Sequence, residues 1–489
     1  LTTVTNSGLI DTTGAGAHGI FAQSIGGGGG NGGMALSADA AFGDDPFAGF
    51  ITIGGGGGGG GNSGDVEVEN TGTIITRGQG AHGVLAQSIS GGGGNAGFGF
   101  GVSRDIPNVL ISNVLSAALG AVRGGSEGDV GRVNVAQNGD ITVLGTGAEA
   151  VKAESIGGGG GSLALDFDGI TSLSGFDGIL ALVGAGDPPP PDLPLVIGEP
   201  GAFRVLTDVR ANPDGAVVAL DLGATDVLND QTGGTLSSVT SGRFVAGGDN
   251  ALVASAISVG GGGGSTSALF DFEELDEVQD FAGLDISLGA EGGTGNAGGE
   301  VTAALEGGSV SAGRNAPGLL SQSVGGGGGR TAALLEGRTA ALAAGDVSLG
   351  ATDATGGAGG DVTRTQIGDV VTGGAVSPGL ILQSIGGGGG DLSLFDVSAV
   401  EAGIGGADRS VTLGGSGGAN NGGGDVDLTM EGGALTQGEG APALLLQSIG
   451  GGGGAARLGG TARTAAPVGG SDGAPGGGGP VKQDLEGDV

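Results

Sequence analysis

The chain has 489 residues, of which 126 are glycine and none is Cys, Trp or Tyr, and its 16 basic and 52 acidic side chains give a formal net charge of −36. This charge argues against nucleic acid and anionic lipid as partners, and the missing cysteine excludes thiol catalysis and Cys-ligated metal. Aromatic residues make up 3% of the chain, so small and short aliphatic side chains must fill the interior, which suits a thin, closely wound structure.

A block that reads GAHGIFAQSIGGGGG at residues 16–30 recurs six more times in variant form. One serine of the block marks the period, at Ser24, Ser88, Ser155, Ser258, Ser323, Ser384 and Ser448. The differences between successive serine numbers are 64, 67, 103, 65, 61 and 64. The chain is therefore a repeat protein with a regular unit and one longer spacing.

Within the block, alternate positions predict a strand. The columns of Ile20, Ala22 and Ser24 hold apolar or small residues in every copy and are predicted to face the core. The columns of Phe21 and Gln23 admit charge, such as Lys152 and Glu154, and are predicted to face outward. The glycine runs that follow form either corners, where positive φ is needed, or extended polyglycine strands packed side by side.

A unit of about 64 residues is too long for one turn of a β-solenoid and predicts about three turns of roughly 21 residues, stacked about 4.8 Å apart. The expected fold class is all-β, a repetitive β-solenoid (a parallel β-helix-like rod) with glycine-rich corners and a length of about 100 Å. Residues 108–122 and 271–281 are candidates for short helices.

The longest spacing contains the proline run at 187–192, which no strand interior would hold. The expected domains are therefore residues 1–163 (repeats one to three), residues 164–247 (an insertion with a proline-rich excursion) and residues 248–489 (repeats four to seven and the start of an eighth). Val4 matches Val68 and Val481 matches Val426, so both ends fall within a repeat. We expect export signals and any membrane anchor to lie outside this window.

An acidic residue recurs after glycine at the start of five units, at Asp65, Asp129, Glu300, Asp361 and Asp425. These acids are the best candidates for a calcium site, although solvated or turn-capping carboxylates are the favoured interpretation. The acidic run at 271–280 is a second candidate, for which a solvated surface is again the commoner explanation. No other metal and no cofactor is expected.

Catalytic arrangements are not found in the sequence. His18 and His82 share one column in which other copies carry Glu149 or proline, and three turns would separate them by about 14 Å. They are predicted to be corner residues near the surface. The glycine runs lack the Gly-Lys-Ser/Thr ending of a phosphate-binding loop. The recurring serines are interpreted as small inward residues that hydrogen-bond the backbone.

The unit GDV-x-V…GAHG-[IV]-x-AQSI-GGGG resembles the glycine-rich repeats in the passenger regions of large bacterial autotransporters (type V secretion). The resemblance covers nearly the whole chain except the insertion. It implies a β-helical rod that is exported through the protein's own outer-membrane β-barrel, outside this window, and displayed on the cell surface. It also implies contacts with ligands on host or neighbouring cells. Homotypic assembly is expected on a separate ground, because the uncapped ends of a solenoid are unpaired strand edges.

The function expected from the sequence is a non-catalytic, surface-exposed or secreted structural or adhesive rod, used for adhesion or biofilm formation. The location expected is extracellular, at a bacterial surface and anchored to the outer membrane. The alternative is a self-assembling extracellular fibre subunit, and a passenger enzyme with its active domain in the insertion or outside the window is a third interpretation.

Overall fold

Every element that the computed structural model describes is a β-strand, and all pairings between strands are parallel. The described residues are 1–14, 16–26, 35–36, 48–53, 61–90, 93–97, 99–100, 114–119, 129–157, 160–167, 216–222, 232–261, 263–272, 279–288, 297–337, 339–340, 346–349, 357–396, 408–413, 421–460, 463–465 and 477–486.

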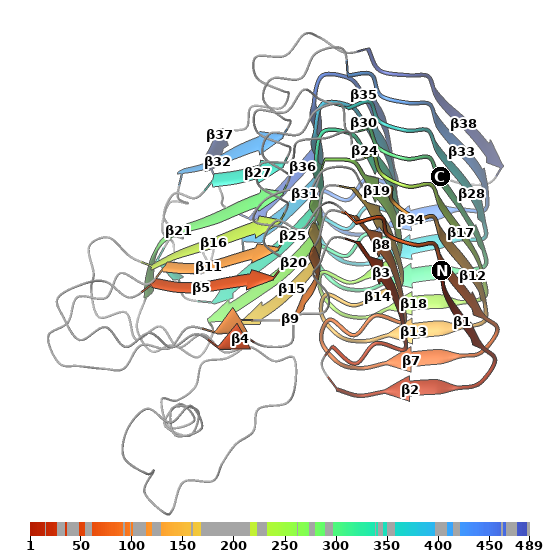
Figure 1. The fold of residues 1–489 in the computed structure, drawn as a ribbon, viewed down its shortest axis with the longest axis horizontal. Helices are drawn as coiled ribbons and strands as arrows, with labels where there is room; N and C mark the ends of the chain where they lie inside the picture. Colours follow the sequence, from red (N-terminus) through yellow and green to blue (C-terminus); the bar gives the residue numbers. More distant parts are fainter. Residues whose placement is uncertain are drawn as a thin grey trace, which may run out of the picture.

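The strands form five large parallel sheets, and each repeat contributes one strand to each of sheets A, B and C (Figure 1). Sheet A consists of β1 (Thr2–Asn6), β6 (Val66–Asn70), β12 (Val133–Asn138), β17 (Leu236–Ser241), β22 (Val301–Glu306), β28 (Val362–Ile367), β33 (Val426–Glu431) and β38 (Val481–Glu486). Sheet B consists of β2 (Ile10–Thr12), β7 (Ile74–Thr76), β13 (Ile141–Val143), β18 (Phe244–Ala246), β23 (Ser309–Ser311), β29 (Val370–Thr372) and β34 (Ala434–Thr436). Sheet C consists of β3 (Ile20–Ile25), β8 (Val84–Ile89), β14 (Glu149–Ile156), β19 (Leu252–Val259), β24 (Leu319–Val324), β30 (Leu380–Ile385) and β35 (Leu444–Ile449).

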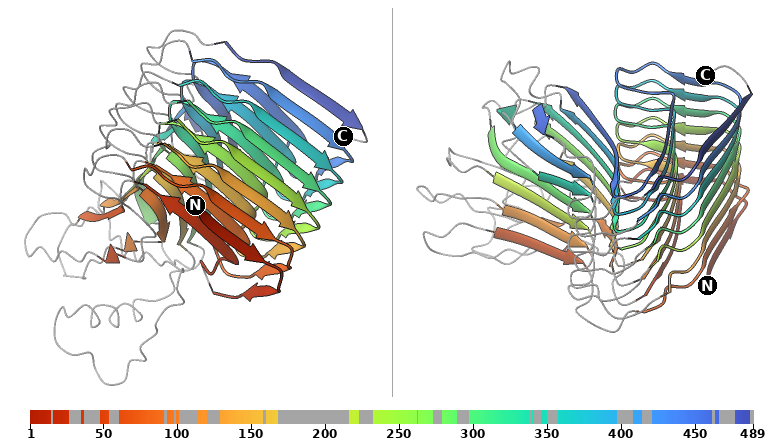
Figure 2. Two further views of the ribbon diagram at one scale, coloured as in Figure 1. Left: turned by 45° about the vertical axis from the view of Figure 1, so that its right-hand side comes forward. Right: turned by 90° about the horizontal axis from the view of Figure 1, so that it is seen from above.

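Two further sheets follow sheet C along the chain. Sheet D consists of β9 (Gly93–Gly97), β15 (Gly160–Phe167), β20 (Gly263–Phe272), β25 (Gly328–Gly337), β31 (Gly389–Asp396) and β36 (Gly453–Gly460). Sheet E consists of β5 (Ala48–Ile53), β11 (Val114–Leu119), β16 (Ala216–Leu222), β21 (Gln279–Leu288), β27 (Asp346–Leu349), β32 (Asp408–Leu413) and β37 (Arg463–Ala465), with β26 (Thr339–Ala340) paired to β21. A separate pair joins β4 (Ala35–Leu36) to β10 (Gly99–Phe100). Seen from above, sheets A, B and C enclose one interior, and sheet E lies apart on the far side of sheet D (Figure 2).

Each repeat forms one layer of this stack. Thr2 pairs with Val66 in sheet A, and Ile20 pairs with Val84 in sheet C, so equivalent positions of consecutive repeats are neighbours. We number the layers from the N-terminus, so β1 to β3 belong to layer 1. The predicted β-solenoid with about three turns per repeat is wrong, because the strands belong to separate parallel sheets and each sheet takes one strand from a repeat. Within the described residues, no repeat is divided into shorter stacked turns.

The height of the stack changes accordingly. Sheet A has eight strands, and seven steps of about 4.8 Å give a height of roughly 34 Å. The expected length of about 100 Å, which assumed three such steps per repeat, is therefore wrong. The molecule gains width rather than length from its long repeat, because each of layers 2 to 7 contributes a strand to all five sheets before the chain climbs to the next layer (Figure 1).

The glycine run between sheets C and D is both a corner and the start of a strand. Gly387 and Gly388 have φ of 85° and 82°, whereas Gly389, which begins β31, has φ of 131°. A Cβ on Gly389 would lie 1.7 Å from the carbonyl oxygen of Gly453 in the next layer. Glycine is needed here for its left-handed backbone and for this close approach. Both structures proposed from the sequence are therefore present in one run.

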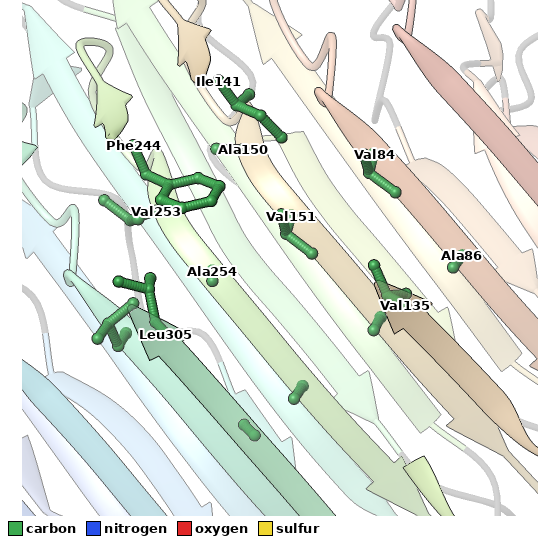
Figure 3. Packing of buried hydrophobic residues seen from close by; sticks show 14 of the residues in the cluster. Val84, Ala86, Val135, Ile141, Ala150, Val151, Phe244, Val253, Ala254 and Leu305 are labelled. Atoms are coloured by element: carbon green, nitrogen blue, oxygen red, sulfur yellow. The ribbon is translucent and has the colours of Figure 1, made fainter. Parts of the chain in front are cut away.

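The first interior lies between sheets A, B and C and is apolar (Figure 3). Residues at alternate positions of each strand point into it, including Val84 and Ala86 from sheet C, Val135 from sheet A and Ile141 from sheet B. The predicted core positions Ile20 and Ala22 belong to it, with 5% and 1% of their surface exposed. Short aliphatic side chains are sufficient because the layers bury their inward faces against one another.

A second interior lies between sheets C and D, and it corrects the predicted outward face. In layer 3, Lys152 is 4% exposed and Glu154 is fully buried, although both were predicted to face solvent. The physical reason is that sheet D covers this face of sheet C. Apolar members of the same columns, such as Leu320 and Ile381, form their own buried cluster here.

Two other expectations concern secondary structure and the insertion. The predicted helices at 108–122 and 271–281 are wrong where described, because Val114–Leu119 is β11 and residues 271–272 and 279–281 belong to β20 and β21. The segment at 164–247 contributes β16, β17 and β18 to the regular sheets. Its proline run at 187–192 lies outside the described residues.

Candidate functional site

The recurring serines join each layer to the next. Ser384, on the inward face of β30, donates a hydrogen bond of 2.7 Å to the carbonyl oxygen of Gly360, where its own layer begins. Its Oγ also accepts a hydrogen bond of 2.7 Å from the backbone N–H of Gly424, where the next layer begins. Equivalent pairs of bonds are made by Ser155, Ser258, Ser323 and Ser448.

The first two serines of this column make related contacts. Ser24 Oγ accepts a hydrogen bond of 2.7 Å from Gly64 N, and Ser88 Oγ donates one of 3.2 Å to Gly64 O. Ser24 thus joins sheet C to the start of sheet A in the next layer, and Ser88 joins it to the start of sheet A in its own layer. The hydroxyls are engaged with the backbone, which gives these serines a structural role.

Two of the five recurring acids, Asp65 and Asp361, cap the backbone of the following layer. Asp65 Oδ1 accepts a hydrogen bond of 2.7 Å from Arg132 N, and Asp361 Oδ1 accepts one of 2.8 Å from Asp425 N. Since β6 pairs Val66 with Val133, the residue level with Asp65 in the next layer is Arg132. The sequence alignment had placed Asp129 at that level, three positions before the true register.

The five calcium candidates are therefore not one column. Glu300, Asp361 and Asp425 occupy consecutive layers, since β22, β28 and β33 pair in register. Asp65 lies in layer 2, separated from Glu300 by Arg132 and Thr235 of layers 3 and 4. Among the described residues, no group of three or more His, Cys, Asp or Glu side chains could hold a metal ion. The acidic residues 273–278 lie outside the described residues.

The two histidines are stacked in adjacent layers, which corrects their predicted separation by three turns. Their ring centroids are 5.0 Å apart and the rings are nearly parallel, at 6°. His18 Nδ1 accepts a hydrogen bond of 3.1 Å from His82 N, and His82 Nδ1 accepts one of 3.0 Å from Glu149 N. Both Nδ1 atoms are therefore occupied as acceptors, so each neutral ring carries its proton on Nε2.

The surroundings keep both rings neutral. Burial, assisted by the positive charge of Lys152, lowers the pKa of His18 to about 4. Burial also lowers the pKa of His82 well below its usual value, and Lys152, His18 and Arg330 add to the effect. His82 is 4% exposed, so the predicted position near the surface is wrong for this residue.

A network of buried charges fills part of the second interior. In β14, Lys152 Nζ lies 3.6 Å from Glu149 Oε1 and 3.7 Å from Glu154 Oε1. Arg330, which sheet D contributes two layers further on, places Nη1 3.9 Å from Glu149 Oε1. Glu154 also accepts hydrogen bonds of 2.6 Å from Ser265 Oγ and from Gln87 Nε2.

The network continues into the later layers through a bidentate pair. Arg457 Nη1 and Nη2 each donate a hydrogen bond of 2.6 Å to the carboxylate of Asp391, which is fully buried. Together the acids Glu149, Glu154 and Asp391 and the bases Lys152, Arg330 and Arg457 carry three charges of each sign. Buried charges that balance one another in this way can hold two sheets in one register, although Arg330 Nε and Nη2 have no hydrogen-bond partner among the described residues.

Polar ladders run parallel to the charges. Gln23 donates to Gln87 at 3.0 Å, and Gln87 continues the chain to Glu154. In later layers Gln322 donates to Gln383 at 2.8 Å, and Gln383 donates to Gln447 at the same distance. Sequence reasoning missed the buried charge network, since its partners come from different repeats and sheets. The signal available was the Gln23 column itself, because glutamine recurs in five of its seven copies.

Among the described residues there is no helix that could span a membrane. No protein-family model, curated protein or solved structure matches the chain.

Proposed function

We propose that the chain is a non-catalytic structural and adhesive element, displayed on a cell surface or secreted. The observation that carries the proposal is that regularly repeated polar side chains are hydrogen-bonded to the backbone. The serine column and the aspartate caps bond to the backbone of adjoining layers. Side chains whose polar atoms bond to the backbone contribute to the assembly of the stack rather than to chemistry on a substrate.

The histidines also fit a structural role. A general base needs a free nitrogen that a substrate can reach, whereas the Nδ1 atoms of His18 and His82 accept backbone hydrogen bonds. The low pKa of His18, about 4, would leave it a weak base. The acidic balance of the chain, 52 acidic against 16 basic residues, supports an exposed and soluble surface.

The test is carried out on intact cells that produce the protein. Antibodies raised against the purified chain should label unbroken cells or the culture medium, and deletion of the coding region should reduce attachment to surfaces or to neighbouring cells. Labelling that appears only after lysis, or attachment that survives the deletion unchanged, would contradict the proposal. Purified protein that grows into filaments with rising concentration would instead favour a self-assembling fibre subunit.

A further inference from the structure

The first interior contains one cation with no acidic partner among the described residues. Arg364 lies on the inward face of β28, between Val362 and Gln366, and is 2% exposed. Its Nη1 donates a hydrogen bond of 2.9 Å to Ser321 Oγ. Its Nε is buried and has no hydrogen-bond partner in the part of the chain that the structure describes.

The neighbours in register with Arg364 are uncharged. Ala303 and Leu428 lie beside it in the two adjoining strands of sheet A. Burial lowers the pKa of Arg364 to about 10, and no charged group contributes to this shift. The guanidinium is therefore protonated at neutral pH, with a full positive charge among uncharged neighbours.

This situation differs from that of the other buried cations. Lys152 lies within 4 Å of two carboxylates, and Arg457 forms a bidentate pair with Asp391. A buried charge without a partner is costly. Buried polar groups without a protein partner usually bond to ordered water or to an ion. Water satisfies the hydrogen-bonding groups but leaves the charge uncompensated, so an anion fits Arg364 better.

The inward positions of layer 5, towards which Arg364 reaches, are small. Ala303 of β22 and Ser321 of β24 face the interior there, and Ser309 of β23 takes the place that Phe244 holds one layer earlier. Two further buried atoms, Ser309 Oγ and Gln366 Oε1, also lack partners among the described residues. The side chains that face the interior in layer 5 beside Arg364 are thus small and uncharged.

We propose that Arg364 binds a single small inorganic anion of the chloride class inside the first interior. Arg364 Nε–H donates to the anion. Ser321 Oγ accepts from Nη1 on the other edge of the guanidinium, which fixes the orientation of the group. The anion neutralises the guanidinium, which makes it an internal stabilising ligand of the folded stack.

The solution test compares urea unfolding in sodium chloride and in sodium gluconate at equal ionic strength. Gluconate is too large to enter a site inside the first interior. The wild-type chain should unfold at higher urea in chloride, and the gain should rise with chloride concentration above the dissociation constant. Arg364→Met should abolish the difference, whereas Arg132→Met, which changes an arginine on the surface, should retain it. Equal unfolding of the wild-type chain in both salts would overturn the proposal.

The direct test is a crystal grown with bromide in place of chloride. An anomalous peak within hydrogen-bond distance of Arg364 Nε, absent from crystals of Arg364→Met, would support the site. A water molecule in that position, no ordered density, or a peak that survives in Arg364→Met would overturn it. Arg364→Met should itself fold, because methionine fills a similar volume without a buried charge.

Discussion

Ser384 Oγ lies 2.7 Å from Gly424 N, so a side chain in sheet C fixes the point at which the backbone enters the next layer. The same hydroxyl donates to Gly360 O at 2.7 Å. One hydroxyl therefore closes its own layer and begins the following one. This pairing explains why serine stands at that position in all seven repeats of the chain.

Replacement of this hydroxyl should be costly. Ser384→Ala removes both hydrogen bonds and leaves the N–H of Gly424 without its acceptor. We expect a loss of about 1–3 kcal/mol in the free energy of unfolding, measured by urea denaturation. Thr363→Ala, which changes an exposed side chain in the same layer, is the matched control and should change stability by less than about 0.5 kcal/mol. Equal losses in both variants would contradict the role of the serine.

Variants of Asp361 distinguish a backbone-capping role of the recurring acids from calcium binding. Its Oδ1 accepts from Asp425 N, and an amide oxygen can accept the same hydrogen bond. Asp361→Asn should therefore keep the stability of the wild-type chain, whereas Asp361→Ala should lose roughly 0.5–1.5 kcal/mol. Both results should be the same with and without a calcium chelator, as thermal unfolding would show. A chelator-sensitive wild-type chain, with Asp361→Asn behaving as if chelated, would restore a calcium site.

The histidine pair predicts a loss of stability in mild acid. The pKa of His18 falls from 6.5 to about 4 on folding, so between these values the unfolded chain binds more protons than the folded chain. Stability from this group is complete above pH 6.5 and decreases as the pH falls towards 4, by at most about 1.4 kcal/mol per pH unit. The pKa of His82 is lowered as well, so both rings act in the same direction.

The measurement is the free energy of unfolding between pH 7 and pH 4. In the double variant His18→Asn with His82→Asn, the Asn oxygens can replace the Nδ1 acceptors, and neither replaced position titrates in this range. The double variant should lose less stability than the wild-type chain as the pH falls. Parallel pH profiles for the two proteins would show that the rings do not titrate as their burial implies.

The Asp391–Arg457 pair tests the balance of the second interior. Asp391→Asn leaves the guanidinium of Arg457 without its carboxylate, and we expect a loss of about 3–5 kcal/mol. Replacement of both residues by leucine should restore most of that stability, since this pair then leaves no charge buried. Urea denaturation of the single and double variants provides the comparison. A double variant as unstable as Asp391→Asn would mean that the two residues stabilise the fold by more than the neutralisation of each other's charge.

The sequence was sufficient to find the repeats and the alternation around Ile20 and Ala22, because both depend on local order along the chain. It could not assign the partner of each strand. The long period of the repeat is compatible with several short turns or with one wide layer, and only the pairing of Ile20 with Val84 distinguishes them. The absence of a shorter period within the unit was the available signal for a single layer.

The charged residues were misplaced for a different reason. Lys152 and Glu154 were assigned to the surface because charges are seldom buried. Their burial depends on sheet D and on Arg330, which lies far from Lys152 along the chain and belongs to another sheet, and no local pattern reveals that contact. The alignment of Asp129 failed because the chain there is three positions longer, which shifts the acid out of register with Asp65.

The central structural claim is that one repeat makes one layer, and a disulfide tests it most directly. Thr363 and Asp427 are paired neighbours on the outer face of sheet A, and the chain contains no cysteine. Thr363→Cys with Asp427→Cys should form an intramolecular disulfide on mild oxidation, since adjacent strands place their Cα atoms about 4.8 Å apart. Thr363→Cys with Lys482→Cys spans two layers, roughly 9.6 Å, and should stay reduced. Failure of the first pair to cross-link, as expected if several turns of chain lay between the two positions, would contradict the layered structure.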